Sequence, residues 1–202
     1  MEPRLEIRRL LDVIPASSRM TINIVSKPEQ PRVIDAAFPL PWNHERRIYI
    51  NFDFWLRLAK PQRDLLILQR VSWLMGVKWF QPQIYQGVVL LGLLAGLLES
   101  VQGDVVGVVV AGGLSTIALG RIWRINQSAD SELNADLTAI RIAQRRGYGE
   151  TEAAEHLLSA IEAIAVMDKN SPLSFNELIR CQNLRAIAGL SAVGVPKSYQ
   201  GQ

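Results

Sequence analysis

Cysteine and histidine are scarce in this chain of 202 residues, which contains only Cys181, His44 and His156. A single cysteine cannot form a disulfide bond within the chain, so a disulfide-stabilised fold is excluded. Two histidines cannot supply a metal site that needs three imidazoles. The sequence also lacks a Gly-rich phosphate-binding loop and any interleaving of aromatic and basic residues. We therefore predict no metal, no other cofactor and no nucleic-acid partner.

Lysine and arginine are absent between residues 84 and 120, a stretch with only two acidic residues. Two uncharged runs lie within it, 84–98 and 105–120, and they are 15 and 16 residues long. With their flanking residues they approach the roughly 20 residues that a membrane-spanning helix needs. The pattern therefore predicts a transmembrane helical hairpin over residues 82–123. A hydrophobic hairpin buried in a soluble core is the alternative.

Basic residues flank this predicted hairpin and avoid its connecting loop. Lys78 precedes the hairpin, and Arg121 and Arg124 follow it. Because cytoplasmic loops carry an excess of lysine and arginine, both termini are predicted to be cytoplasmic in an integral membrane protein. The predicted parts are a cytoplasmic N-terminal part at 1–81, the hairpin at 82–123, a cytoplasmic helical part at 124–190 and a flexible tail at 191–202.

Hydrophobic periodicity predicts the elements outside this region. Apolar residues alternate over residues 20–25 and 47–54, which indicates two strands. One helix is predicted to begin at Pro61 and a second to cover residues 131–146. A third is predicted to begin at Thr151, which would cap it. Ser174 and Glu177 have the spacing of a capping box, which predicts the start of a last helix. The predicted fold class is α+β, mostly α, with small N-terminal strands and an interrupting transmembrane hairpin.

The helix predicted over residues 131–146 contains an E-x-x-x-D motif at Glu132 and Asp136, followed by Ala139 and the residues RRGY at 145–148. Upstream, residues 46–68 read RRIYINFDFWLRLAKPQRDLLIL. Together these segments resemble membrane zinc metallopeptidases of the heat-shock and prenyl-protein-processing type. In that family an H-E-x-x-H helix binds zinc and activates water, and the glutamate of E-x-x-x-D is a third zinc ligand.

The expected H-E-x-x-H sequence is absent. Its positions are occupied by Gln69, Arg70 and Trp73. Because arginine stays protonated, it cannot act as a base and it opposes a nearby cation. The resemblance therefore implies a degenerate metal site made of Gln69, Arg70, Trp73, Glu132 and Asp136, without catalytic residues. Arg70 is expected to pair with Glu132 at this junction.

Residues 8–20 read RRLLDVIPASSRM, and this stretch resembles an uncharacterised cyanobacterial membrane-protein family. The resemblance implies a location in the thylakoid or plasma membrane of a cyanobacterium. The combined interpretation is a non-catalytic pseudo-metallopeptidase that binds another protein, with a role in assembly, stability or quality control of a membrane complex such as a photosynthetic one. Such scaffolds bind a partner as an added strand, and the predicted edge strand carries Ile48, Ile50 and Phe52.

Three alternatives remain open at this stage. Glu132 and Asp136 could form one solvated helix face, since charged residues are usually exposed. The protein could be a zinc-dependent membrane protease with non-standard ligands. It could also be a basic protein that binds a lipid surface, because its formal net charge is +3.

Overall fold

The computed structural model describes residues 3–39, 45–76, 129–168 and 173–191. All of them lie in one compact unit, to which residues 1–77 and 129–202 belong. Its elements are α1 (Pro3–Val13), α2 (Ala16–Arg19), β1 (Ile22–Ser26), β2 (Ile34–Ala36), β3 (Arg46–Ile50), α3 (Phe52–Trp55), α4 (Lys60–Gly76), α7 (Ala129–Gln144), α8 (Glu150–Met167) and α9 (Phe175–Ile187). The coarse prediction of an α+β fold that is mostly helical is confirmed.

The three strands form one small sheet in the order β1-β3-β2. β3 runs parallel to β1, with Ile48 opposite Ile24, and antiparallel to β2, with Ile48 opposite Ala36. Ile48 and Ile50 are both fully buried. The prediction that Ile48, Ile50 and Phe52 form a partner-binding edge is therefore wrong, because β3 is the central strand and Phe52 begins α3.

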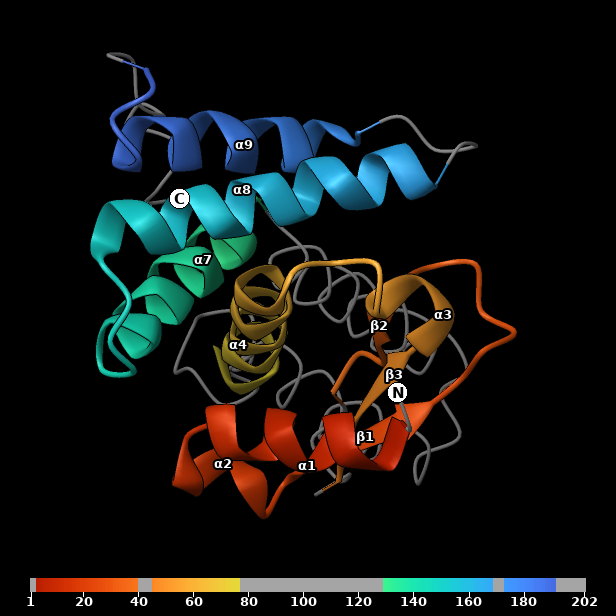
Figure 1. The fold of residues 1–202 in the computed structure, drawn as a ribbon. Helices are drawn as coiled ribbons and strands as arrows, with labels where there is room; N and C mark the ends of the chain where they lie inside the picture. The colour runs from red at the N-terminus through yellow and green to blue at the C-terminus, as the bar shows by residue number, and fades with distance from the viewer. Residues whose placement is uncertain (1–2, 40–44, 77–128, 169–172, 192–202) are drawn as a thin grey trace, which may run out of the picture. The chain divides into compact units, whose positions relative to one another are not determined.

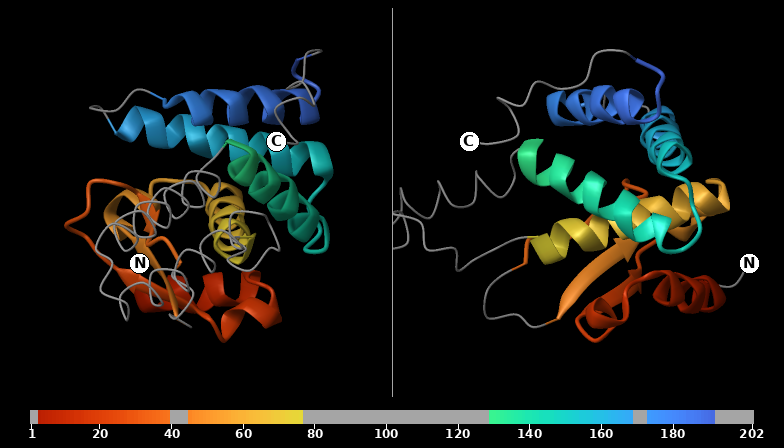
Figure 2. Two further views of the ribbon diagram at one scale, coloured as in Figure 1. Left: turned by 180° about the vertical axis from the view of Figure 1, so that it is seen from behind. Right: turned by 90° about the vertical axis from the view of Figure 1, so that its left-hand side faces the viewer.

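Helix α4 packs against α1, α7 and α8. Its sequence from Leu65 to Leu74 is apolar on nearly every side, which is typical of a helix that is buried all round. Figure 1 shows α8 and α9 side by side, with α7 and α4 beneath them, the strands beside and below α4, and α1 and α2 at the bottom. Figure 2 shows the same order from two further directions. The buried apolar residues of these elements form one core cluster, apart from Leu133 of α7.

The helix ends follow local capping chemistry. Ser174 and Glu177 form the predicted capping box at the start of α9, where each side chain bonds the other residue's backbone N–H. The start of α8 differs from its prediction, since the N-cap residue is Gly149 and not Thr151. After α7 the chain turns at Gly147, whose φ of +95° lies in the left-handed region that favours glycine.

A cluster of charged side chains joins α1 to α4, and we call it the α1–α4 network. Glu6 is fully buried and accepts hydrogen bonds from Arg9 at 2.8 and 2.9 Å, from Arg63 at 2.6 Å and from the Trp55 indole at 3.3 Å. Arg9 also bonds Asp64, whose other oxygen accepts the Tyr148 hydroxyl at 2.9 Å. Burial and this bond to Asp64 raise the pKa of Tyr148 to about 12.

The structure corrects the prediction of an integral membrane protein. Within the residues that the structure describes, no helix combines the length and the apolar character needed to cross a bilayer. The predicted hairpin at 82–123 itself lies outside the described residues. Its two uncharged runs have only 15 and 16 residues, fewer than the roughly 20 of a membrane-spanning helix, so the prediction depended on counting flanking residues. The membrane location inferred from it is withdrawn.

Candidate functional site

A cleft of about 320 Å³ lies within the unit that the structure describes. Its walls come from the start of β2, the middle of α4, the start of α7, the end of α8 and the start of α9. Its polar lining includes Arg32, Gln69, Arg70, Glu132, Asp168, Glu177 and Arg180. Three of the five residues predicted for the degenerate metal site, Gln69, Arg70 and Glu132, therefore line one cleft.

Glu132 lies 18% exposed where α4, α7 and α9 meet. The Gln69 amide donates a hydrogen bond of 2.6 Å to its Oε2 atom. Arg180 Nη1 lies 3.4 Å from the same oxygen, while Arg70 Nη1 lies 3.9 Å from Oε1. The expected pairing of Arg70 with Glu132 is thus present, but Gln69 and Arg180 make the closer contacts.

Asp136, one turn along α7, is fully buried. Arg180 on α9 donates two hydrogen bonds to it, from Nε at 2.9 Å and from Nη2 at 2.7 Å. Burial raises the pKa of Asp136, and the charge and hydrogen bonds of Arg180 oppose that rise. The alternative of a solvated helix face is therefore wrong for Asp136.

Sequence reasoning missed Arg180, which links both carboxylates to α9. A signal was present in the sequence: Arg180 precedes Cys181 and lies one helical turn before Leu184, and both are buried. A charged residue on the buried face of a helix needs an opposite charge, because burying an unpaired ion is costly. The E-x-x-x-D motif was the available partner.

Trp73 and Arg70 complete the predicted set. The Trp73 side chain is 7% exposed and packs edge-on against Phe38, with ring centroids 6.3 Å apart. The Arg70 guanidinium lies 5.8 Å from the centre of the Trp73 ring. Trp73 is therefore a packing residue behind Arg70, and it does not line the cleft.

The groups around Glu132 do not fit a zinc ion. Zinc needs imidazole, thiolate or carboxylate ligands, whereas Gln69, Arg70 and Arg180 present N–H donors to the carboxylate. Two of these three groups are cations that repel a metal. In the described part of the chain, no three His, Cys, Asp or Glu side chains are grouped as a metal site would require. We derive no metal-dependent step at this site.

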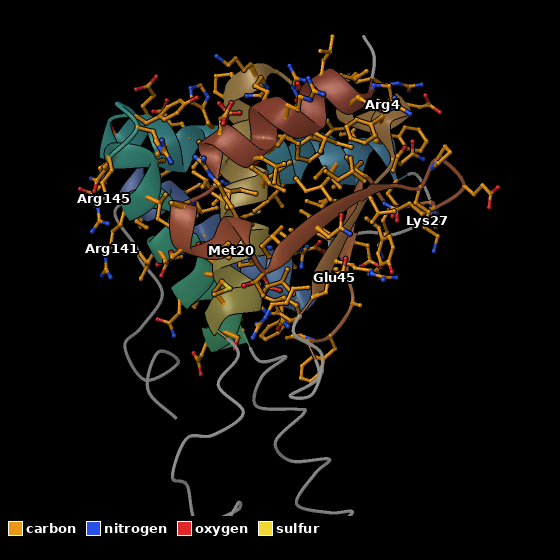
Figure 3. The ribbon with its side chains drawn as sticks, turned by 90° about the horizontal axis from the view of Figure 1, so that it is seen from below. Arg4, Met20, Lys27, Glu45, Arg141 and Arg145 are labelled. Carbon is orange, nitrogen blue, oxygen red and sulfur yellow. The ribbon has the colours of Figure 1, made fainter. Side chains whose placement is uncertain are left out.

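The alternative of a basic surface binder requires basic side chains gathered on one face. Figure 3 shows Arg4, Lys27, Arg141 and Arg145 spread around the periphery of the face seen from below, with Glu45 on the same side as Lys27. Only Arg141 and Arg145, one turn apart near the end of α7, lie next to each other in this view. This arrangement provides no concentrated basic patch among the labelled residues.

Removing the Glu132 side chain tests which contacts hold the α4–α7–α9 junction together. Glu132→Ala leaves the buried Gln69 amide without its acceptor, so we expect a loss of about 1–3 kcal/mol in the free energy of unfolding. Glu132→Gln keeps an acceptor oxygen, and we expect it to lose less. Urea unfolding of the two variants measures the difference. Equal losses would show that the charge of Glu132, and not its bond to Gln69, stabilises the junction.

The comparisons with known proteins give one match. A family model described as "Protein of unknown function (DUF3318)" matches residues 8–148, which is well over half of the chain. The matched range includes Gln69, Arg70, Glu132 and Asp136, and it ends at Tyr148 of the α1–α4 network. No curated protein and no solved structure is significantly similar to the chain.

Proposed function

The chain belongs to the DUF3318 family, and we propose that it is a non-catalytic protein-binding member on a scaffold related to that of zinc metallopeptidases. In this proposal the cleft beside β2 receives an extended segment of a partner protein. This proposal rests on the hydrogen bonds and ion pairs that occupy the two carboxylates. Glu132 and Asp136 are engaged by Gln69 and Arg180, while the cleft lies next to Glu132.

Two features support a binding role without catalysis. General-base catalysis needs a carboxylate or imidazole that can accept a proton from a reactant. Asp136 has no exposed surface, and Glu132 faces N–H donors on α4 and α9. These side chains fix three helices to one another, so their effect is structural.

The geometry of β2 supports recognition of an extended segment. β2 lies at an end of the sheet in the described residues. The backbone N–H of Asn51, the residue directly after β3, donates a hydrogen bond of 3.0 Å to the Val33 carbonyl. Hydrogen-bonded positions alternate along an antiparallel pair, so Ile34 and Ala36 direct their backbone N–H and C=O groups away from β3. A partner segment can pair with β2 at these positions and enter the cleft at Ile34.

Selection of displayed random peptides on the purified full chain tests this proposal. We expect a consensus peptide with a micromolar Kd. Ala36→Pro should weaken its binding by about tenfold or more, because proline removes an outward N–H but no bond to β3. Ala36→Ser keeps that N–H and is the matched control.

Two results would overturn the proposal. The first is a failure to enrich any peptide, or enrichment of peptides that bind Ala36→Pro and the wild type equally. The second is cleavage of bound peptides that a chelator stops, because it would establish the alternative of a zinc-dependent protease with non-standard ligands.

A further inference from the structure

Arg70 is the unusual side chain of the cleft, because it is mostly enclosed and makes no hydrogen bond in the described part of the chain, only the 3.9 Å ion pair with Glu132. Its side chain is 22% exposed, and its Nε atom is buried without a hydrogen-bond partner. Its closest carboxylate oxygen, Glu132 Oε1, lies 3.9 Å from Nη1, beyond hydrogen-bond distance. A buried N–H donor without an acceptor costs free energy, so this geometry favours an acceptor from outside the fold.

Glu132 makes its hydrogen bond and its closer ion pair with other residues, and its Oε1 atom lies 3.9 Å from Arg70. Its Oε2 atom already accepts the 2.6 Å bond from Gln69 and lies 3.4 Å from Arg180. Arg180 in turn is held by the buried Asp136 through two hydrogen bonds. The junction of the three helices is therefore satisfied without Arg70, and the Arg70 guanidinium remains available toward the cleft that it lines.

Charged side chains of both signs line the cleft. Arg70 lies on the α4 wall, and Arg32 on the β2 wall is paired with Asp35 at 3.5 Å. The α7 wall carries Glu132, the end of α8 carries Asp168, and the α9 wall carries both Glu177 and Arg180. Glu177 is occupied at the α9 N-terminus, where it accepts bonds of 2.8 Å from the Ser174 backbone N–H and hydroxyl. Glu132 is faced by Gln69 and Arg180, and Arg180 is held by Asp136. The buried Nε–H of Arg70 has no acceptor in the described residues, so an additional anionic group is favoured next to Arg70.

We propose that Arg70 binds a carboxylate of the segment that enters the cleft, either an Asp or Glu side chain or a C-terminal carboxylate. The planar guanidinium presents its N–H donors in a fork that matches a carboxylate. A volume of about 320 Å³ is at the small end of ligand pockets, so the cleft takes the carboxylate-bearing residue of a longer segment. This inference rests on the proposed function, since it names the group that the partner presents.

The experiment observes the Arg70 Nε–Hε resonance by NMR in the full chain, with Arg70→Lys to assign it. Three probes are added at millimolar concentration: N-acetylalanine for a C-terminal carboxylate, N-acetylglutamate α-amide for a side-chain carboxylate, and N-acetylalanine amide as the control. We expect a saturable shift with at least one carboxylate and none with the control. The carboxylate that binds more tightly identifies the source. No shift with either carboxylate would overturn the inference.

The selected peptides provide the second arm. One carboxylate of the selected peptide, the group expected to bind Arg70, is converted to an amide. This change should raise the Kd for the wild type by about tenfold or more and should change the Kd for Arg70→Gln little. Peptides that bind through β2 regardless of their carboxylates would overturn the Arg70 inference and leave the proposed function standing. A carboxylate-dependent shift of the Arg70 resonance without any peptide binding would overturn the proposed function and leave carboxylate binding by Arg70 standing.

The fold of the variants separates binding from a structural role. Arg70→Gln removes no hydrogen bond within the described residues, only a 3.9 Å ion pair and a ring contact, so its melting temperature should stay within a few degrees of the wild type. A large fall in melting temperature for both Arg70→Gln and Arg70→Lys would overturn the inference, because it would show that Arg70 is needed to hold α4 and α7 together.

Discussion

Arg180→Met is expected to lower the free energy of unfolding by about 3–5 kcal/mol, the range measured when one partner of a buried ion pair is removed. Arg180 is 6% exposed and Asp136 is fully buried. Their two hydrogen bonds of 2.7 and 2.9 Å would be lost, and the Asp136 carboxylate would remain in the core without a counterion. Chemical denaturation of the purified chain measures the loss.

The loss should depend on pH. Burial already raises the pKa of Asp136, and Arg180 opposes that rise. Without Arg180 the pKa of Asp136 rises further, so the folded variant takes up a proton that the unfolded chain releases near its ordinary value of 3.8. The folded variant is therefore relatively more stable at pH 5 than at pH 8, and its deficit against the wild type should grow as the pH rises.

Two further variants make this result specific. Arg185→Met lies on the same helix and removes a pair with Glu162 in which both side chains are 46% exposed, so it should cost no more than about 1 kcal/mol. Arg180→Met with Asp136→Leu removes the stranded carboxylate and should recover most of the lost stability. If the double variant were as unstable as Arg180→Met, the buried charge would not be the cause.

The parts of the fold that depend on neighbouring residues were predictable from the sequence. Ser174 and Glu177 lie three residues apart, and capping is decided by that spacing alone, so the start of α9 is as predicted. The alternation over residues 47–54 likewise predicts a strand, which the structure places at Arg46–Ile50. Local patterns are sufficient for such elements because the bonds that form them are local.

The position of β3 in the sheet was not predictable in the same way. Ile34–Ala36 form a strand of only three residues between Pro-rich segments, and no alternation marks it. Without β2, the strand at 46–50 looks like an edge. Pairing with β2 and β1 on opposite sides makes it central, and this pairing depends on segments that are distant in the sequence.

In the candidate site, too, part was predictable from local motifs and part depends on contacts between segments distant in the sequence. The expected pairing of Arg70 with Glu132 across two helices is present at 3.9 Å. The hydrogen bond from Gln69 to Glu132 was not expected. The resemblance gave no role to Arg180, because the E-x-x-x-D motif and the RRGY ending that carry it stop at residue 148, before α9. The third helix of the junction supplies the counterion of Asp136, and only the assembled fold brings α9 against α7.

Glu6→Ala is the second substitution with a large expected effect, a loss of about 3–5 kcal/mol in the free energy of unfolding. Glu6 is fully buried, and it is the common acceptor for Arg9, Arg63 and Trp55. Its removal leaves two guanidinium groups in the α1–α4 network with a single remaining carboxylate, that of Asp64. Loss of α1 docking on α4 should follow, and hydrogen exchange in α1 would detect it.

The acid dependence of stability identifies the charge of Glu6 as the cause. Burial alone would raise the pKa of Glu6, but the hydrogen bonds and charges of Arg9 and Arg63 and the Trp55 N–H outweigh burial and lower it. The stabilisation is therefore complete above the unfolded value of 4.5 and is lost as the pH falls through the lower folded value. Glu6→Gln has no such titration, so its deficit against the wild type should shrink below pH 4.5.

Glu155→Gln provides the matched control, because Glu155 is exposed on α8 and its substitution should change stability by less than about 0.5 kcal/mol at any pH. A deficit for Glu6→Gln that stays constant from pH 7 to pH 3 would contradict this account. It would show that hydrogen-bond geometry at Glu6, and not its ionised carboxylate, holds α1 on α4.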